Sequence, residues 1–145
     1  MVDKMIQAIQ QHSIPITNFK DDLGSLVTTI RDQKYILLGE SSHGTSEFYK
    51  IRTEITKKLI EEKGFTFIAV EGDWPACQQV NRYIKGYSNE FKNARDVLMS
   101  FRRWPTWMWA NEEIIDLIEW LKEFNQGKSG EKKVGFYGID IYSLW

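Results

Sequence analysis

The sequence has little of several features that define whole classes of protein. Its 145 residues contain a single cysteine, Cys77, so the chain cannot form an internal disulfide, and a cytoplasmic setting fits this usage. The formal net charge of -1 at pH 7 gives no reason to expect a nucleic acid or an anionic membrane as a partner. No apolar run approaches the roughly 20 residues that cross a bilayer, and the N-terminus shows no apolar core of a signal peptide. We therefore expect a cytoplasmic protein that acts on a small molecule, and the sequence leaves its oligomeric state open.

The residues that are present describe an ordinary globular domain with an unusual aromatic content. Hydrophobic residues make up 42% of the chain and charged residues 27%, and such a chain is long enough for one domain that buries about 70% of its unfolded surface. Aromatic residues reach 14%, with six tryptophans. The chain ends at Trp145, just past a predicted strand, whereas natural termini are more often polar. We predict one domain over residues 1–145, cut from a longer protein, with a helical segment over residues 1–33 packing on it.

Three segments share one pattern, a short apolar run that stops at a carboxylate. They are residues 35–40, 67–73 and 134–140. Their alternation with helical patterns is typical of a parallel sheet, so we predict an α/β fold with a small, mostly parallel sheet of three strands flanked by helices. Ligands bind at the carboxyl ends of such strands. We therefore expect one edge of the sheet to gather Glu40, Glu71, Asp73 and Asp140.

The intervals between these runs carry helix signals at their ends. Capping residues, Pro in a first turn and Gly after a last turn mark the boundaries. The predicted helices are two within residues 1–30, broken near Pro15; one from Thr45 or Ser46 to Gly64; one after Asp73, ending near Gly86; a short one capped by Asn93; and a long one over residues 111–124.

The first carboxylate-ended run continues into a turn that carries a histidine. Glu40 and His43 lie three residues apart in this turn. Histidine exchanges protons near neutral pH, and an adjacent carboxylate can fix its tautomer, as the acid of a catalytic triad does. His43 is therefore our candidate general base for a water or a substrate hydroxyl. The alternative is structural, with His43 and Ser42 satisfying the N–H groups at the start of the next helix.

Two further charged residues are candidates for the same site. Arg52 lies seven residues into the helix that begins at Thr45, and it can point back to clamp a carboxylate or to stabilise an oxyanion. The alternative is a surface ion pair with Glu47 or Glu54. Glu71 ends the second run after four apolar residues, where a carboxylate is costly unless it is paired or functional.

The remaining polar residues near the strand ends have simpler explanations. Asp73 is better explained as a helix N-cap, and Asp140 either orients the other carboxylates or contacts substrate. Ser41 and Ser42 lack the G-x-S-x-G pattern of a nucleophile. Cys77 has no histidine near it in sequence, so a buried structural role is favoured.

Two other ligand chemistries remain open. Carboxylates with one histidine suit Mg²⁺, Mn²⁺ or a non-haem metal, but no H-x-x-x-H or C-x-x-C pair is present. We therefore expect no cofactor and keep a divalent metal as the alternative. Trp107 and Trp109 can stack on a sugar or a macrocycle, or they pack helices together as most aromatic clusters do.

From residue 35 onward the chain carries a specific combination of sequence blocks. These are Leu38–Gly44, Glu47–Tyr49 with Arg52, Val70–Pro75, Val80–Tyr83, Arg103–Trp104, Trp107–Trp109 and Gly138–Trp145. Together they strongly resemble the erythromycin esterase family, whose members are also labelled succinoglycan biosynthesis protein. The resemblance implies hydrolysis of an ester, which in macrolide-resistance members is the lactone of a macrocycle, and hence a role in the response to an antibiotic.

The resemblance also implies roles for individual residues. His43 would correspond to the histidine proposed to activate a water, and Glu40, Arg52 and Glu71 match acidic and basic residues of the family site. Family members are much longer and have further site histidines downstream. The 1–145 segment would then be the N-terminal part of a larger α/β hydrolytic domain, would hold half of a site, and would be inactive by itself.

Our leading hypothesis is a carboxylic ester hydrolase that attacks an ester or lactone with a His43-activated water. One alternative is a metal-dependent hydrolase or transferase of polysaccharide metabolism that uses Glu40, Glu71, Asp140 and His43. Another is a non-catalytic protein that binds a saccharide or a macrocycle through its tryptophans.

Overall fold

In the computed structural model, residues 1–36 and residues 37–145 form two units, within which residues 2–19 and 22–141 are described. The first unit contains α1 (Val2–His12) and α2 (Leu23–Thr29), which confirms the two N-terminal helices. Leu23 and Val27 of α2 are buried, whereas the apolar side chains of α1 are exposed. The packing of residues 1–33 on the rest of the chain stays a prediction. Across the described residues, no helix combines the length and apolar content that a bilayer crossing requires.

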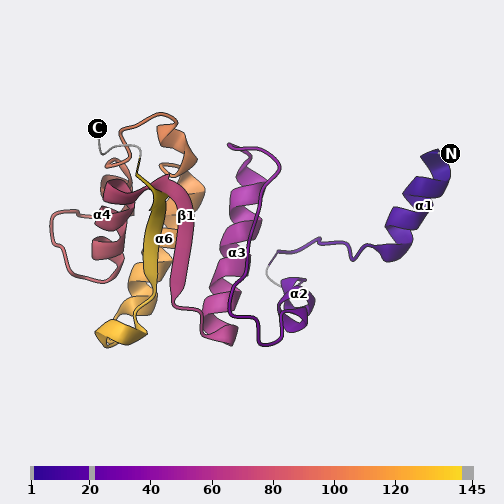
Figure 1. The fold of residues 1–145 in the computed structure, drawn as a ribbon, viewed down its shortest axis with the longest axis horizontal. Coiled ribbons are helices and arrows are strands. Elements are labelled where there is room, and N and C mark those ends of the chain that lie inside the picture. Colours follow the sequence, from indigo (N-terminus) through magenta and orange to yellow (C-terminus); the bar gives the residue numbers. More distant parts are fainter. Residues whose placement is uncertain (1, 20–21, 142–145) are drawn as a thin grey trace. The chain divides into compact units, whose positions relative to one another are not determined.

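The second unit follows the predicted alternation of helices and strands from residue 46 onward (Figure 1). Thr45 occupies the N-cap position of α3 without a side-chain hydrogen bond, and Gly64 ends the helix in a left-handed conformation. Asn93 and Asn111 accept backbone N–H groups at the starts of α5 and α6. The elements are α3 (Ser46–Lys63), β1 (Phe67–Asp73), α4 (Trp74–Ile84), α5 (Ala94–Leu98), the 3-10 turn η1 (Thr106–Met108), α6 (Glu112–Asn125), η2 (Gly130–Lys132) and β2 (Gly135–Asp140).

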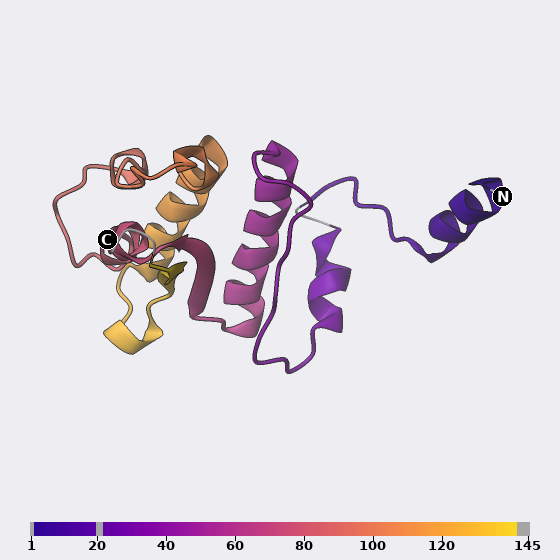
Figure 2. The ribbon, with the colours of Figure 1, turned by 45° about the horizontal axis from the view of Figure 1, so that its top comes forward.

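The sheet consists of β1 and β2, which lie side by side as parallel strands (Figures 1 and 2). Their register pairs Phe67 with Gly135 and Asp73 with Asp140, with an irregularity between Val70 and Asp73. The predicted α/β fold with a small parallel sheet flanked by helices is confirmed. Because the strands are parallel, their terminal carboxylates meet at one edge, as expected for Asp73 and Asp140.

The prediction of a first strand at Tyr35–Leu38 is wrong. Residues 35–40 have no regular secondary structure, and Tyr35 and Leu37 are 84% and 90% exposed. A strand is stable only when its backbone groups pair with a neighbour, and among the described residues the sheet holds β1 and β2 alone. The apolar run therefore has strand composition without a pairing partner, and the predicted three-stranded sheet is corrected to two strands.

The core of the second unit is built by the helices around this sheet. α4 packs along β2, and α6 packs against α3, α4 and α5. The largest fully buried side chains of this unit are Tyr83, Phe136, Ile84, Leu98, Ile114, Ile118, Leu121, Val80, Val97 and Val134. They come from α4, α5, α6, β2 and the residue before β2, so one apolar cluster fixes the elements that carry the strand ends.

A buried asparagine ties the start of β2 to the helices. The Asn125 side chain, 1% exposed, donates to the carbonyls of Ile84 and Val134, both at 3.0 Å, and accepts the Val134 N–H at 2.8 Å. Asn81 accepts the Phe136 N–H at 3.1 Å. A buried backbone group without a partner costs about 1–3 kcal/mol. These two side chains therefore hold in place the strand that ends at the site.

Candidate active site

The turn between residues 39 and 45 holds the histidine and one carboxylate in direct contact. Nδ1 of His43 contacts Oε1 of Glu40, and Nη1 of Arg52 donates to Oε2 of the same carboxylate at 3.1 Å. An ionised carboxylate only accepts hydrogen bonds, so Nδ1 carries the proton and Nε2 of a neutral ring is the basic nitrogen. Within the described residues nothing is hydrogen-bonded to that nitrogen. The His43 side chain is 43% exposed and that of Glu40 is 16% exposed, so solvent reaches the imidazole more readily than the carboxylate.

Arg52 links this turn to the end of β1. Its guanidinium lies over the ring of Tyr49, 5.0 Å from the centroid, and over the ring of Trp109, 5.6 Å from the centroid. Cation–π contacts of this kind fix the plane of a guanidinium. The indole N–H of Trp109 donates to the Glu71 carbonyl at 2.7 Å. A continuous series of contacts therefore runs from His43 through Glu40 and Arg52 to the strand.

Gly44 lets the turn pass close to Trp107. Its φ of 80° lies in the left-handed region, and a Cβ at this position would lie 3.3 Å from the Trp107 ring. The rings of His43 and Trp107 meet edge to face, with 6.5 Å between centroids. Since Trp107 is 43% exposed, an aromatic surface is available beside the candidate base.

The carboxyl end of the sheet forms a second acidic group. Asp73 is 8% exposed and lies in register with Asp140 above the buried Cys77. Burial, and then the charges of these two carboxylates, raise the pKa of the Cys77 thiol to about 12. The thiol therefore stays protonated at neutral pH, and the structural interpretation of Cys77 fits its burial.

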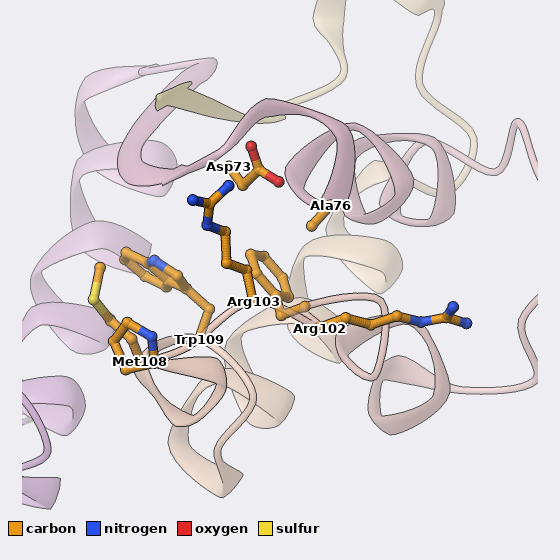
Figure 3. Close-up of a pocket in the computed structure, with 8 residues that line it drawn as sticks. Asp73, Ala76, Arg102, Arg103, Met108 and Trp109 are labelled. Carbon is orange, nitrogen blue, oxygen red and sulfur yellow. The ribbon is translucent and has the colours of Figure 1, made fainter. Parts of the chain in front are cut away.

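A cavity of about 20 Å³ lies between this end of the sheet and the segment 101–109 (Figure 3). Asp73, Arg103 and Trp109 contribute to its wall, and the guanidinium of Arg103 points toward Asp73, whereas that of Arg102 points away. A space of this size holds about one water molecule. Side chains therefore fill the sheet end, and a substrate needs another surface.

The predicted site residues thus fall into separate places. Glu40, His43 and Arg52 are together, and Asp140 lies with Asp73. Glu71 is exposed at the end of β1, and no hydrogen bond or ion pair in the described part of the chain joins its carboxylate to Glu40, His43 or Arg52. The four carboxylates predicted to lie together are therefore only partly gathered. Asp73 and Asp140 meet at the strand ends, whereas Glu40 follows no strand and is bound by Arg52.

The two tryptophans predicted to stack on a ligand differ in exposure, and the residues of the alternative metal site do not form a group. Trp109 is 9% exposed, so of the two tryptophans Trp107 alone offers much of its ring to solvent. Across residues 2–19 and 22–141, no three His, Cys, Asp or Glu side chains are grouped so that they could hold a metal ion.

Sequence reasoning missed two residues beside the turn. Tyr49, 2% exposed, lies one helical turn before Arg52, and the i, i+3 spacing is a signal that could have found it. Burial is the largest cause that raises the pKa of its hydroxyl. Glu113 accepts the Ser46 hydroxyl at 2.5 Å, across 67 residues of sequence, and no local pattern announces such a contact.

Comparisons with known proteins agree on the relatives of this chain. The family model described as erythromycin esterase matches residues 60–145. Erythromycin esterase type II of Escherichia coli is 32% identical over 121 residues, which are 83% of this chain and 26% of that protein. A crystal structure titled succinoglycan biosynthesis protein is similar with a TM-score of 0.78 and 29% identity, covering 95% of this chain and 34% of its own.

A Bacillus cereus protein of known structure, 22% identical with a TM-score of 0.78, shares the fold over 97% of this chain and 33% of its own. The chain therefore spans between about a quarter and a third of the length of these relatives. The family match extends from the last turns of α3 through β1, α4, α5, α6 and β2, which is more than half of the sequence. The chain belongs to the erythromycin esterase family.

Proposed function

We propose that the protein is an ester hydrolase in which His43 is the general base that activates a water molecule. The observation that carries this proposal is the contact of His43 Nδ1 with Glu40, whose second oxygen is held by Arg52. A carboxylate on one nitrogen of an imidazole fixes the tautomer that leaves the other nitrogen free to take a proton. The partial exposure of His43 gives a water molecule access to that nitrogen.

The reaction follows from this arrangement in two proton transfers. Nε2 of His43 takes a proton from water as the oxygen attacks the carbonyl carbon of the ester, which produces a tetrahedral oxyanion and an imidazolium. The bond from that carbon to the alcohol oxygen then breaks, and the imidazolium returns the proton to the departing alkoxide. Glu40 stays ionised and stabilises the imidazolium between these steps.

The other predicted residues have supporting roles in this proposal. Arg52 holds Glu40 in place and adds positive charge near the developing oxyanion. Glu71 and Asp140 lie at strand ends where they can receive donors from a substrate, and Trp107 offers an exposed ring beside His43. The buried Trp109 positions Arg52.

The names of the relatives support two kinds of substrate. Erythromycin esterase type II supports the lactone of a macrocycle, and with it a role in the response to an antibiotic. The structure titled succinoglycan biosynthesis protein supports an ester carried by a saccharide. Because those relatives are about three times as long as this chain, we assign the activity to the complete protein. We also propose that it acts in the cytoplasm and without a resident cofactor.

The decisive variant is His43→Ala in the complete protein. We expect hydrolysis to fall about 10²- to 10⁴-fold, with little change in the free energy of unfolding, because the side chain is 43% exposed. Mass spectrometry of macrolide lactones and acylated saccharides would follow the products. His12→Ala, which removes the other histidine from exposed α1, is the matched control and should leave the rate unchanged.

A normal rate in the His43→Ala variant would show that another group activates the water. The metal-dependent alternative is tested in the same assay by a chelator. We expect the rate to survive chelation, and a rate that is lost and then restored by Mg²⁺ or Mn²⁺ would favour the alternative.

A further inference from the structure

A larger cavity adjoins the His43 turn. It has a volume of about 390 Å³, which is within the range of small-molecule sites. It shares Gly44 and Trp107 with the surroundings of His43, since Gly44 is the next residue and the Trp107 ring contacts the imidazole. Its lining residues are Gly44, Ser46, Tyr49, Trp107, Asn111 and Glu113.

One wall of this cavity carries a charged acceptor. The hydroxyl of Ser46 donates to Oε1 of Glu113, and this hydrogen bond is the main cause that lowers the pKa of Glu113. Glu113 is therefore ionised at neutral pH, and a carboxylate with one such donor still has lone pairs for others. Lys50 adds positive charge near the same group.

Another wall is formed by the buried side chain of Tyr49. The Tyr49 ring is 2% exposed, and its hydroxyl oxygen lies near the Gly44 N–H but makes no hydrogen bond of ordinary geometry. Because the hydroxyl exposes almost no surface, Tyr49 contributes its ring to this wall and not a donor for an occupant. The half-exposed ring of Trp107 completes the cavity with an apolar face.

These three walls select the chemistry of the occupant. A cation would satisfy Glu113 but would lie near the positive charge of Lys50. An anion would be repelled by Glu113. A neutral hydroxylated ring donates to Glu113 and presents C–H faces to Trp107, with neither of these conflicts.

We propose that this cavity is a subsite for a neutral polyhydroxylated ring, such as a pyranose, and that it holds the alcohol portion of the ester next to His43. The placement next to a reacting ester depends on the proposed hydrolase function, whereas binding of the ring does not. Binding and turnover are therefore measured separately.

The binding test uses methyl α-D-glucopyranoside and methyl α-D-galactopyranoside with the complete protein, followed by saturation-transfer NMR. We expect binding that weakens at least about 10-fold in Trp107→Ala and in Glu113→Gln and persists in His43→Ala. Trp104→Ala and Glu112→Gln are matched controls, since Trp104 is 81% exposed, Glu112 pairs with Arg95, and neither lines the cavity. If Trp107→Ala does not fold, the near-isosteric Glu113→Gln decides the outcome alone.

The kinetic test compares esters that carry a pyranose with esters of a simple alkyl alcohol. In Glu113→Gln we expect KM to rise for the pyranose esters only, with kcat nearly unchanged. Choline as a second probe distinguishes a cation site. Two results would overturn the subsite: pyranoside binding that is equal in wild type and Glu113→Gln, or choline binding that depends on Glu113. Normal turnover in His43→Ala would overturn the hydrolase mechanism alone.

Discussion

The His43 turn and the Asp73–Asp140 end of the sheet hold their acidic side chains by different means. In the turn, Glu40 is kept in place by the side chains of His43 and Arg52. At the sheet end, Asp73 and Asp140 are positioned by strand register over a buried thiol. The first arrangement depends on side-chain contacts at a partly exposed surface, and the second depends on the backbone and the core.

This difference separates function from stability. Side-chain contacts near the surface contribute little to the free energy of unfolding, but they decide which imidazole nitrogen is basic. Backbone pairing and core packing determine whether the sheet forms at all. Variants of the turn should therefore alter chemistry without unfolding, and variants that reach the sheet should unfold the protein without altering the chemistry of the molecules that stay folded.

The largest effect is expected from Glu40→Gln in the complete protein. The amide keeps the size of the side chain, but its NH₂ group can donate to the histidine, which favours the wrong tautomer and removes the charge that stabilises the imidazolium. We expect the rate of ester hydrolysis to fall about 10²- to 10⁴-fold, with an unchanged denaturation midpoint. Glu47→Gln, which changes an exposed carboxylate in the first turn of α3, is the control. A Glu40→Gln enzyme with the full rate would remove Glu40 from the mechanism.

A smaller effect, on stability alone, is expected from Asn125→Ala. The substitution leaves the N–H and carbonyl of Val134 and the carbonyl of Ile84 without their buried partner. We expect a loss of about 3 kcal/mol in the free energy of unfolding, measured by denaturant titration, while the rate per folded molecule is kept. Asn93→Ala removes a helix cap and should cost about 1 kcal/mol. Equal losses of unfolding free energy in the two variants would contradict the claim that Asn125 satisfies three buried backbone groups.

Local features of this fold could be predicted from the sequence because their causes are local. Asn93 caps the short helix that follows it, and Thr45 occupies the N-cap position of α3, so both lie next to the helix that they precede. The pairing of Glu40 with His43 spans three residues, and the strand Phe67–Asp73 needed only its apolar run and its carboxylate. These local signals are sufficient to predict the turn and the end of the strand.

The rest could not be predicted because it depends on contacts between distant elements. The hydrogen bond from Trp109 to Glu71 joins residues 38 positions apart, and that from Ser46 to Glu113 joins residues 67 positions apart. The false strand Tyr35–Leu38 has the same origin, since its composition is correct and only a partner is missing. Separation of Glu71 from the His43 turn likewise follows from side-chain directions, which an apolar pattern does not encode.

The smallest effect is expected from Ser46→Ala, because the Ser46 hydroxyl forms the hydrogen bond that joins the start of α3 to α6. Because the Ser46 hydroxyl is the main cause of the lowered pKa of Glu113, the variant should raise that pKa toward the ordinary value of a glutamate. A carboxyl whose pKa is lowered in the folded state stabilises the fold at pH values above its unfolded pKa. This stabilisation is lost as the pH falls through the folded pKa. Ser46→Ala should therefore reduce the free energy of unfolding slightly at neutral pH and leave it unchanged at pH values below the folded pKa. Carboxyl NMR titration of Glu113 measures the pKa directly. Ser42→Ala, whose hydroxyl contacts Thr45, should leave it unchanged. A Glu113 pKa that does not move in Ser46→Ala would mean that the two helix starts are not joined in solution, and the cavity beside His43 would then lose the contact that shapes its charged wall.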